Sequence, residues 1–97
     1  MGWQFNKVRR RIGRPLSDSA RDVLSAAAAY YVAFGTHATL RQIMADTGIV
    51  STSTTRYQLS RLADAGYIDR IERGTAHVYV PTEAGLTVAR GWQNGED

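Results

Sequence analysis

Apolar residues recur at helical spacing along the first part of the chain, which predicts a helix that begins near Ser17. A serine in front of a helix can accept a hydrogen bond from the backbone of the first turn, and acidic residues such as Asp18 and Asp22 are stabilising at that end. The pattern continues to Gly35, and its expected inner face consists of Ala20, Val23, Leu24, Ala27, Tyr31 and Phe34. We therefore expect one long first helix with this face in the core.

A second, shorter helix is predicted between Thr39 and Gly48. Thr39 and Gln42 have the spacing of a capping box, in which each side chain bonds to the backbone of the other residue. Gly48 suits the left-handed conformation in which many helices end. Only two residues separate this glycine from Ser51, which can cap a third helix. Two helices joined by so short a turn must cross steeply, as they do in a helix-turn-helix motif.

The third helix begins with a run of five hydroxyl residues, from Ser51 to Thr55. Its apolar stripe is expected at Thr55, Leu59, Leu62 and Gly66. At about 100° per residue, the outward positions are then Ser53, Tyr57, Ser60 and Arg61, with Thr54 and Arg56 on the two flanks. Buried hydroxyls need hydrogen-bond partners, so a core has little use for five in a row. Local capping can explain the run by itself, and contact with a ligand is the alternative.

From Tyr67 onward, the pattern changes to two β-branched runs, 67–72 and 76–80, around the turn Arg73-Gly74-Thr75. These runs predict a hairpin that ends before Pro81, and Thr82 can cap a final helix from Glu83 to about Arg90. The expected fold is mainly α with a small β-hairpin, a winged helix-turn-helix with a three-helix core, a two-stranded wing and a C-terminal helix. We expect a basic arm at 1–15, the domain at 16–91 and a polar tail at 92–97.

The composition narrows the classes of function that a chain of 97 residues can have. It suits one modest domain, and the absence of cysteine rules out disulfides and thiolate metal sites. His37 and His77 are isolated from other metal-ligating residues, so we expect no metal and no cofactor. No nucleophile with a base and no phosphate-binding glycine loop is present, so we expect no enzyme. No apolar stretch is long enough for a membrane span, and the expected location is the cytoplasm.

Positive charge is concentrated at the N-terminus. Residues 1–14 carry five cations and no acid, whereas residues 15–97 carry seven arginines and nine acidic residues. A solvated tail is one interpretation of such a cluster, and phosphate binding is the other. Gly13-Arg14-Pro15 also resembles the centre of short DNA-binding motifs whose extended backbone places an arginine in a narrow minor groove. If the arm binds DNA, its contacts are Arg9, Arg10, Arg11 and Arg14.

The outer face of the third helix has the chemistry of a base-contacting surface. Hydroxyls can donate or accept, threonine methyls can meet the thymine methyl, and Arg56 can bond guanine with two hydrogen bonds. In helix-turn-helix proteins, the N-terminal part of the second motif helix contacts base edges. The capping box, short turn, hydroxyl-led helix, hairpin and basic arm together favour nucleic acid as the ligand.

The segment from Leu16 to Val80 resembles the winged helix-turn-helix domain of the LexA repressors, above all in STSTTRYQLSRL followed by GYI. The resemblance implies that the hairpin is a wing that touches phosphates and that the base-contacting residues are Ser51, Ser53, Thr54, Arg56 and Tyr57. The protease domain of those repressors has no counterpart here, so self-cleavage is not expected. The segment PTEAGLTVAR instead resembles the post-wing helix of MarR- or PadR-like regulators.

We therefore expect a sequence-specific regulator of transcription that binds double-stranded DNA and represses by occupying its operator. Beyond the residues already named for base contact and for the arm, the expected DNA-binding set includes Thr39, Arg41, Arg61, Arg73 and His77. A homodimer is expected, joined through the alanine-rich first helix or through Leu86, Val88 and Trp92 of the last helix. The alternative is a winged-helix module for protein interaction, replication or DNA architecture, with no operator of its own.

Overall fold

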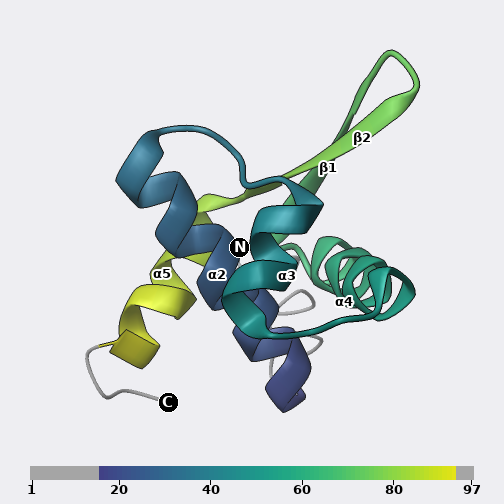
Figure 1. Cartoon of the computed structure of the whole chain (residues 1–97). Helices are drawn as coiled ribbons and strands as arrows, with labels where there is room; N and C mark the ends of the chain where they lie inside the picture. The colour runs from purple at the N-terminus through teal and green to yellow at the C-terminus, as the bar shows by residue number, and fades with distance from the viewer. Residues whose placement is uncertain (1–15, 94–97) are drawn as a thin grey trace.

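The computed structural model describes residues 16–93, which form four helices and one antiparallel two-stranded sheet (Figure 1). The elements follow the order expected of a winged helix-turn-helix, and this prediction is confirmed. Their bounds are α2 (Asp18–Phe34), α3 (Leu40–Thr47), α4 (Thr52–Asp64), β1 (Ile68–Arg73), β2 (Ala76–Pro81) and α5 (Glu83–Gln93).

Local capping determines where the first three helices begin and where two of them end. The Ser17 side chain accepts from the backbone of Ala20 at 3.1 Å, and the backbone N–H of Gly35 closes α2 by donating to the carbonyl of Tyr31. Thr39 and Gln42 form the predicted capping box of α3. Gly48 follows α3 with a φ of 81°, a left-handed conformation that glycine adopts at little cost.

The core lies where α2, α3 and α4 meet. Thr55, Leu59 and Leu62 of α4 are fully buried, as their spacing predicts, and the two leucines join Val23 and Leu24 of α2 in one apolar cluster. The expected fourth member of the stripe is wrong, since α4 ends at Asp64 and Gly66 lies beyond it in an exposed turn. The backbone of Gly66 has a φ of 90° there, so the position requires glycine for its conformation.

Phe34 does not lie in the core, and the prediction for this residue is wrong. It follows the buried positions of α2 at helical spacing, but it occupies the last turn, beside an open groove between α2 and α3. Its side chain is 67% exposed and packs on the ring of Tyr30, with the ring centroids 4.6 Å apart. Periodicity gives the direction of a side chain and does not show whether a neighbouring element covers it.

The wing is a regular hairpin that projects away from the helices (Figure 1). Its register pairs Ile68 with Pro81 at the base and Arg73 with Ala76 at the tip, around a turn in which Gly74 has a φ of 62°. Pro81 was expected to lie beyond the hairpin, but it is the last paired residue of β2 and is buried. A proline is tolerated at a strand end because its missing N–H is not needed there.

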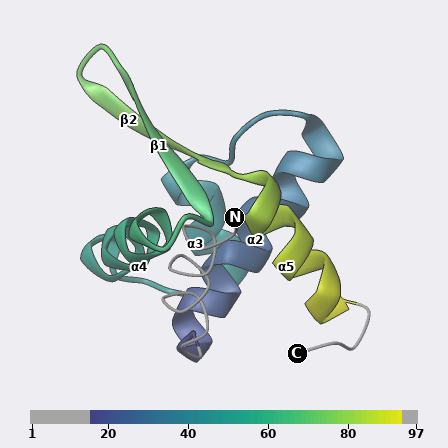
Figure 2. The same ribbon diagram turned by 180° about the vertical axis from the view of Figure 1, so that it is seen from behind.

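Thr82 joins the base of the wing to the last helix. Its hydroxyl donates to the carbonyl of Gly66 at 2.8 Å and accepts from the backbone of Gly85, while its backbone N–H donates to the carbonyl of Tyr67. From this cap, α5 continues to Gln93, past the predicted end near Arg90. Helices α4 and α5 lie on opposite sides of the molecule in both views (Figures 1 and 2).

Two residues of α5 that were expected at a dimer interface are partly buried within one chain. Val88 and Trp92 pack against the core cluster, and the Arg21 guanidinium lies 4.7 Å from the centre of the Trp92 ring. Leu86 lines a surface groove between α2 and α5. Packing within one chain therefore uses part of Val88 and Trp92, and the interface through these three residues stays a prediction.

We expect Gly85→Ala to destabilise the fold, because a methyl group there would overlap the backbone carbonyl of Tyr67. Overpacking of this kind costs about 1 to 3 kcal/mol. Thermal unfolding followed by circular dichroism measures the effect, with exposed Thr87→Ala in the same helix as the control. A Gly85→Ala variant as stable as the parent would show that α5 does not approach Tyr67 this closely.

Candidate nucleic-acid interface

Two of the five adjacent hydroxyls at the start of α4 serve the fold. The Ser51 side chain accepts from the backbone N–H of Thr54 at 3.1 Å, so it is the predicted cap. The Thr55 hydroxyl is buried and donates to the carbonyl of Ser51 at 3.0 Å. Capping by Ser51 and burial of Thr55 thus account for the first and last members of the run and leave the three between them unexplained.

The three middle hydroxyls, on Thr52, Ser53 and Thr54, are exposed in the first turn of α4. Within residues 16–93, the hydroxyls of Ser53 and Thr54 have no hydrogen-bond partner, and that of Thr52 makes only a long contact of 3.9 Å to the sulfur of Met44. Exposed hydroxyls at a helix start can each donate and accept. The first turn therefore presents unused hydrogen-bonding groups to any ligand that approaches it.

The next turns of α4 add an aromatic ring and two cations. Arg61 donates from Nη1 to the Tyr57 hydroxyl oxygen at 3.1 Å, and its guanidinium lies 5.7 Å from the centre of that ring. This contact holds Arg61 on the helix surface and leaves the Tyr57 hydroxyl proton for another acceptor. Arg56 is exposed and has no ion pair or hydrogen bond among residues 16–93. No acidic residue occurs on α4 before Asp64, so this surface attracts anions.

Other predicted residues lie on α3 and on the wing. Arg41 is exposed in the first turn of α3, and the neighbouring Thr39 hydroxyl is already engaged in the capping box. Arg73 is exposed at the end of β1, beside the wing turn. The imidazole of His77 lies 3.6 Å from the Glu72 carboxylate across the hairpin. A phosphate at His77 would have to compete with that carboxylate.

The structure thus brings Ser51, Ser53, Thr54, Arg56, Tyr57 and Arg61 together on one helix, whereas Arg73 and His77 lie on the wing. Arg9, Arg10, Arg11 and Arg14 of the predicted arm lie outside the described residues.

Two exposed residues, one before α4 and one on the wing, are absent from the set predicted from the sequence. Val50 is 92% exposed and immediately precedes the cap of α4, whereas its neighbour Ile49 packs against the core. A pair of apolar residues in a short turn gives no indication of which one faces outward. Arg70 is exposed on β1 and pairs in register with Tyr79. Strand alternation would not have identified Arg70, since Arg70 shares a face of β1 with buried Ile68 and is exposed because the wing projects beyond the helices (Figure 1).

Among residues 16–93, no group of three or more His, Cys, Asp or Glu side chains is arranged to hold a metal ion. None of the described helices combines the length and the apolar character that crossing a bilayer requires.

Comparison with known proteins gives a family for the chain and a related fold. A family model described as the LexA DNA binding domain matches residues 13–76, which include the whole of α4 and most of the hairpin. The structure is also similar to the crystal structure of AF1382 from Archaeoglobus fulgidus, with a TM-score of 0.69 and 15% sequence identity over 87% of this chain and 90% of that one. At this identity, the likeness concerns the fold. No curated protein matches the chain in sequence.

The two serines at the start of α4 should respond differently to alanine. Ser51→Ala removes the cap and should lower the free energy of unfolding by about 1 kcal/mol. Ser53→Ala removes a hydroxyl with no partner among the described residues and should change the stability by less than about 0.5 kcal/mol. Urea unfolding of the two variants measures both effects. Equal losses would mean that Ser53 has a structural role that its exposed position does not indicate.

Proposed function

Because this chain belongs to the family of LexA DNA-binding domains, we propose that it regulates transcription by recognising a specific sequence of double-stranded DNA with α4. The observation that carries this proposal is the first turn of α4, where Thr52, Ser53 and Thr54 are exposed while other residues supply the capping. A helix N-terminus in the major groove brings such side chains to base edges.

The chemistry of the surface supports contacts with several kinds of base. The hydroxyls of Ser53 and Thr54 can donate to or accept from any base pair, and Arg56 can bond a guanine through two nitrogens. The Tyr57 hydroxyl keeps its proton for a base edge, and Arg61, which donates a hydrogen bond to that hydroxyl, lies one turn farther along the helix and suits a flanking phosphate. We further propose that exposed Val50 packs on a thymine methyl, since it has no apolar neighbour to cover it.

Residues on α3 and on the wing are expected to position the protein on the DNA backbone. Arg41 and Arg73 are exposed cations, one on α3 and one on the wing. The Thr39 hydroxyl and the His77 imidazole are polar groups on the same two elements. Such contacts fix orientation and carry no sequence information. Their loss should weaken binding to all duplexes in a similar way.

The basic arm supplies charge that the described part of the chain lacks. Residues 16–93 carry seven arginines and seven acidic residues, so they have no net charge to attract a polyanion. The five cations of residues 1–14 are therefore expected to bind phosphates or a minor groove.

Repression by operator occupancy, in the cytoplasm and as a homodimer, completes the proposal. We expect neither catalysis nor a cofactor. A module for protein interaction alone would present an apolar outer face on α4, whereas the exposed positions of this helix are polar apart from the Tyr57 ring.

Arg56→Ala should reduce binding to the preferred sequence more than binding to random DNA. Loss of a bidentate guanine contact costs about 1 to 3 kcal/mol on the specific site. Fluorescence anisotropy with both duplexes gives the two losses, and exposed Thr87→Ala on α5 is the control. Equal losses on the two duplexes would make Arg56 a phosphate contact and would remove it from the sequence-specific set.

Removing the charge of the arm should weaken binding to every duplex. If three to five arm cations each neutralise a phosphate, the slope of log affinity against log salt should flatten by about 3 to 4 units. Replacing Lys7 and the four arm arginines by glutamine tests this without shortening the chain, and thermal unfolding serves as the control. A salt slope that does not change would show that the arm is directed away from DNA.

A further inference from the structure

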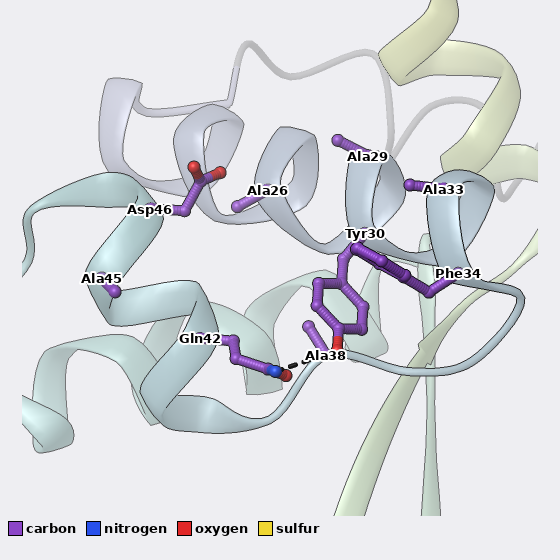
Figure 3. Close-up of a pocket in the computed structure, with 9 residues that line it drawn as sticks. All are labelled: Ala26, Ala29, Tyr30, Ala33, Phe34, Ala38, Gln42, Ala45 and Asp46. Carbon is purple, nitrogen blue, oxygen red and sulfur yellow. Dashed lines mark hydrogen bonds between the residues drawn. The ribbon is translucent and has the colours of Figure 1, made fainter.

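A second surface of interest lies on the C-terminal half of α2, where Ala29 and Ala33 form a low ridge between two grooves. The wider groove has a volume of about 440 Å³ and lies between α2 and α3 (Figure 3). The narrower groove has a volume of about 250 Å³ and lies between α2 and α5. Both alanines line both grooves, so the ridge and its two flanking hollows form one continuous surface.

Large apolar side chains protrude on each side of this ridge. Val32 is 72% exposed and lines the narrower groove, whereas Phe34 is 67% exposed and lines the wider one. The Phe34 ring packs on Tyr30, whose hydroxyl accepts from Nε2 of Gln42 at 2.9 Å (Figure 3). This bond fixes the aromatic wall of the wider groove. Contiguous apolar surface of this kind is unusual on a protein that has no partner.

We propose that this face is the interface between two copies of the chain, with α2 packed against α2 across a two-fold axis. A two-fold interface must be complementary to itself. This surface meets that condition because it contains protruding side chains, Val32 and Phe34, and apolar hollows beside them. The ridge of Ala29 and Ala33 allows two helix axes to come close together, since the axial distance depends on the size of the side chains at the contact.

The charges at the surface are compatible with self-association. The lining of the two grooves includes one carboxylate, Asp46, and one guanidinium, Arg90, on opposite sides of the ridge. Two copies can therefore meet without net repulsion between their groove linings. Asp22, exposed two turns before Ala29 on α2, limits the apolar strip at its N-terminal end.

The position of the surface leaves the DNA-contacting helix uncovered. Helix α5, which with α2 lines the narrower groove, lies on the opposite side of the molecule from α4 (Figures 1 and 2). A pair joined there would keep both α4 helices exposed for two half-sites of a symmetric operator. This consequence rests on the proposed function, but the association itself can be measured in the absence of DNA.

Sedimentation equilibrium of the full chain without DNA is the first test. The parent should sediment at twice 10.7 kDa, the mass of one chain. Ala29→Glu would place two like charges close together near the axis, so self-association should weaken by at least about 100-fold. Ala84→Glu, at an exposed position of α5 that lines neither groove, should leave the dimer intact. Circular dichroism establishes that both variants are folded.

Cysteine pairing provides a second measurement, because the chain has no cysteine of its own. Ala33→Cys places a single thiol on the ridge, near the proposed axis, and should form a disulfide-linked dimer under mild oxidation. Ala84→Cys should remain monomeric on a denaturing gel. A parent that sediments as a monomer at high concentration, or an Ala29→Glu variant that remains dimeric, would overturn the proposed interface. Either result would leave the contacts of α4 with DNA to be judged by their own experiments.

Discussion

The burial of Thr55, Leu59 and Leu62 against α2 is the constraint on which the rest of this structure depends. The burial of these three side chains fixes the rotation of α4 about its own axis. Once they face inward, every other residue of α4 has its direction assigned. The exposed hydroxyls, Arg56 and Tyr57 are therefore displayed together because of a packing requirement on the opposite side of the helix. The stability of the fold and the DNA recognition that we propose for α4 therefore depend on opposite sides of the same helix.

Features that depend on neighbouring residues along the chain could be predicted from the sequence. Ser17, Thr39 and Ser51 cap their helices as expected, because a cap needs only a side chain and the backbone a few residues away. The same locality explains the glycine ends of α2 and α3. The outer residues of α4 were also predictable, since the spacing of two leucines determines the inner face.

Features that depend on which elements meet in space could not be predicted in this way. Phe34 has the helical spacing of the core residues, but no other element covers it. Trp92 belongs to a helix at the surface, but its side chain packs against the core. Pro81 pairs at the base of the wing because a strand end makes no demand on its nitrogen. The exposure of Val50 depends on the conformation of the turn between α3 and α4, which the sequence does not specify.

The two surfaces for which we propose functions differ in polarity, since the exposed face of α4 is polar and that of α2 is apolar. The central claim concerns the first of them, that α4 selects a DNA sequence through exposed side chains of its first turn. Selection of bound duplexes from a random pool tests it most directly, carried out with the full chain and with a variant in which Thr52, Ser53 and Thr54 are alanine. We predict a clear consensus for the parent and a weakened or altered consensus for the variant. No enrichment by the parent, or the same consensus from both proteins, would contradict the claim.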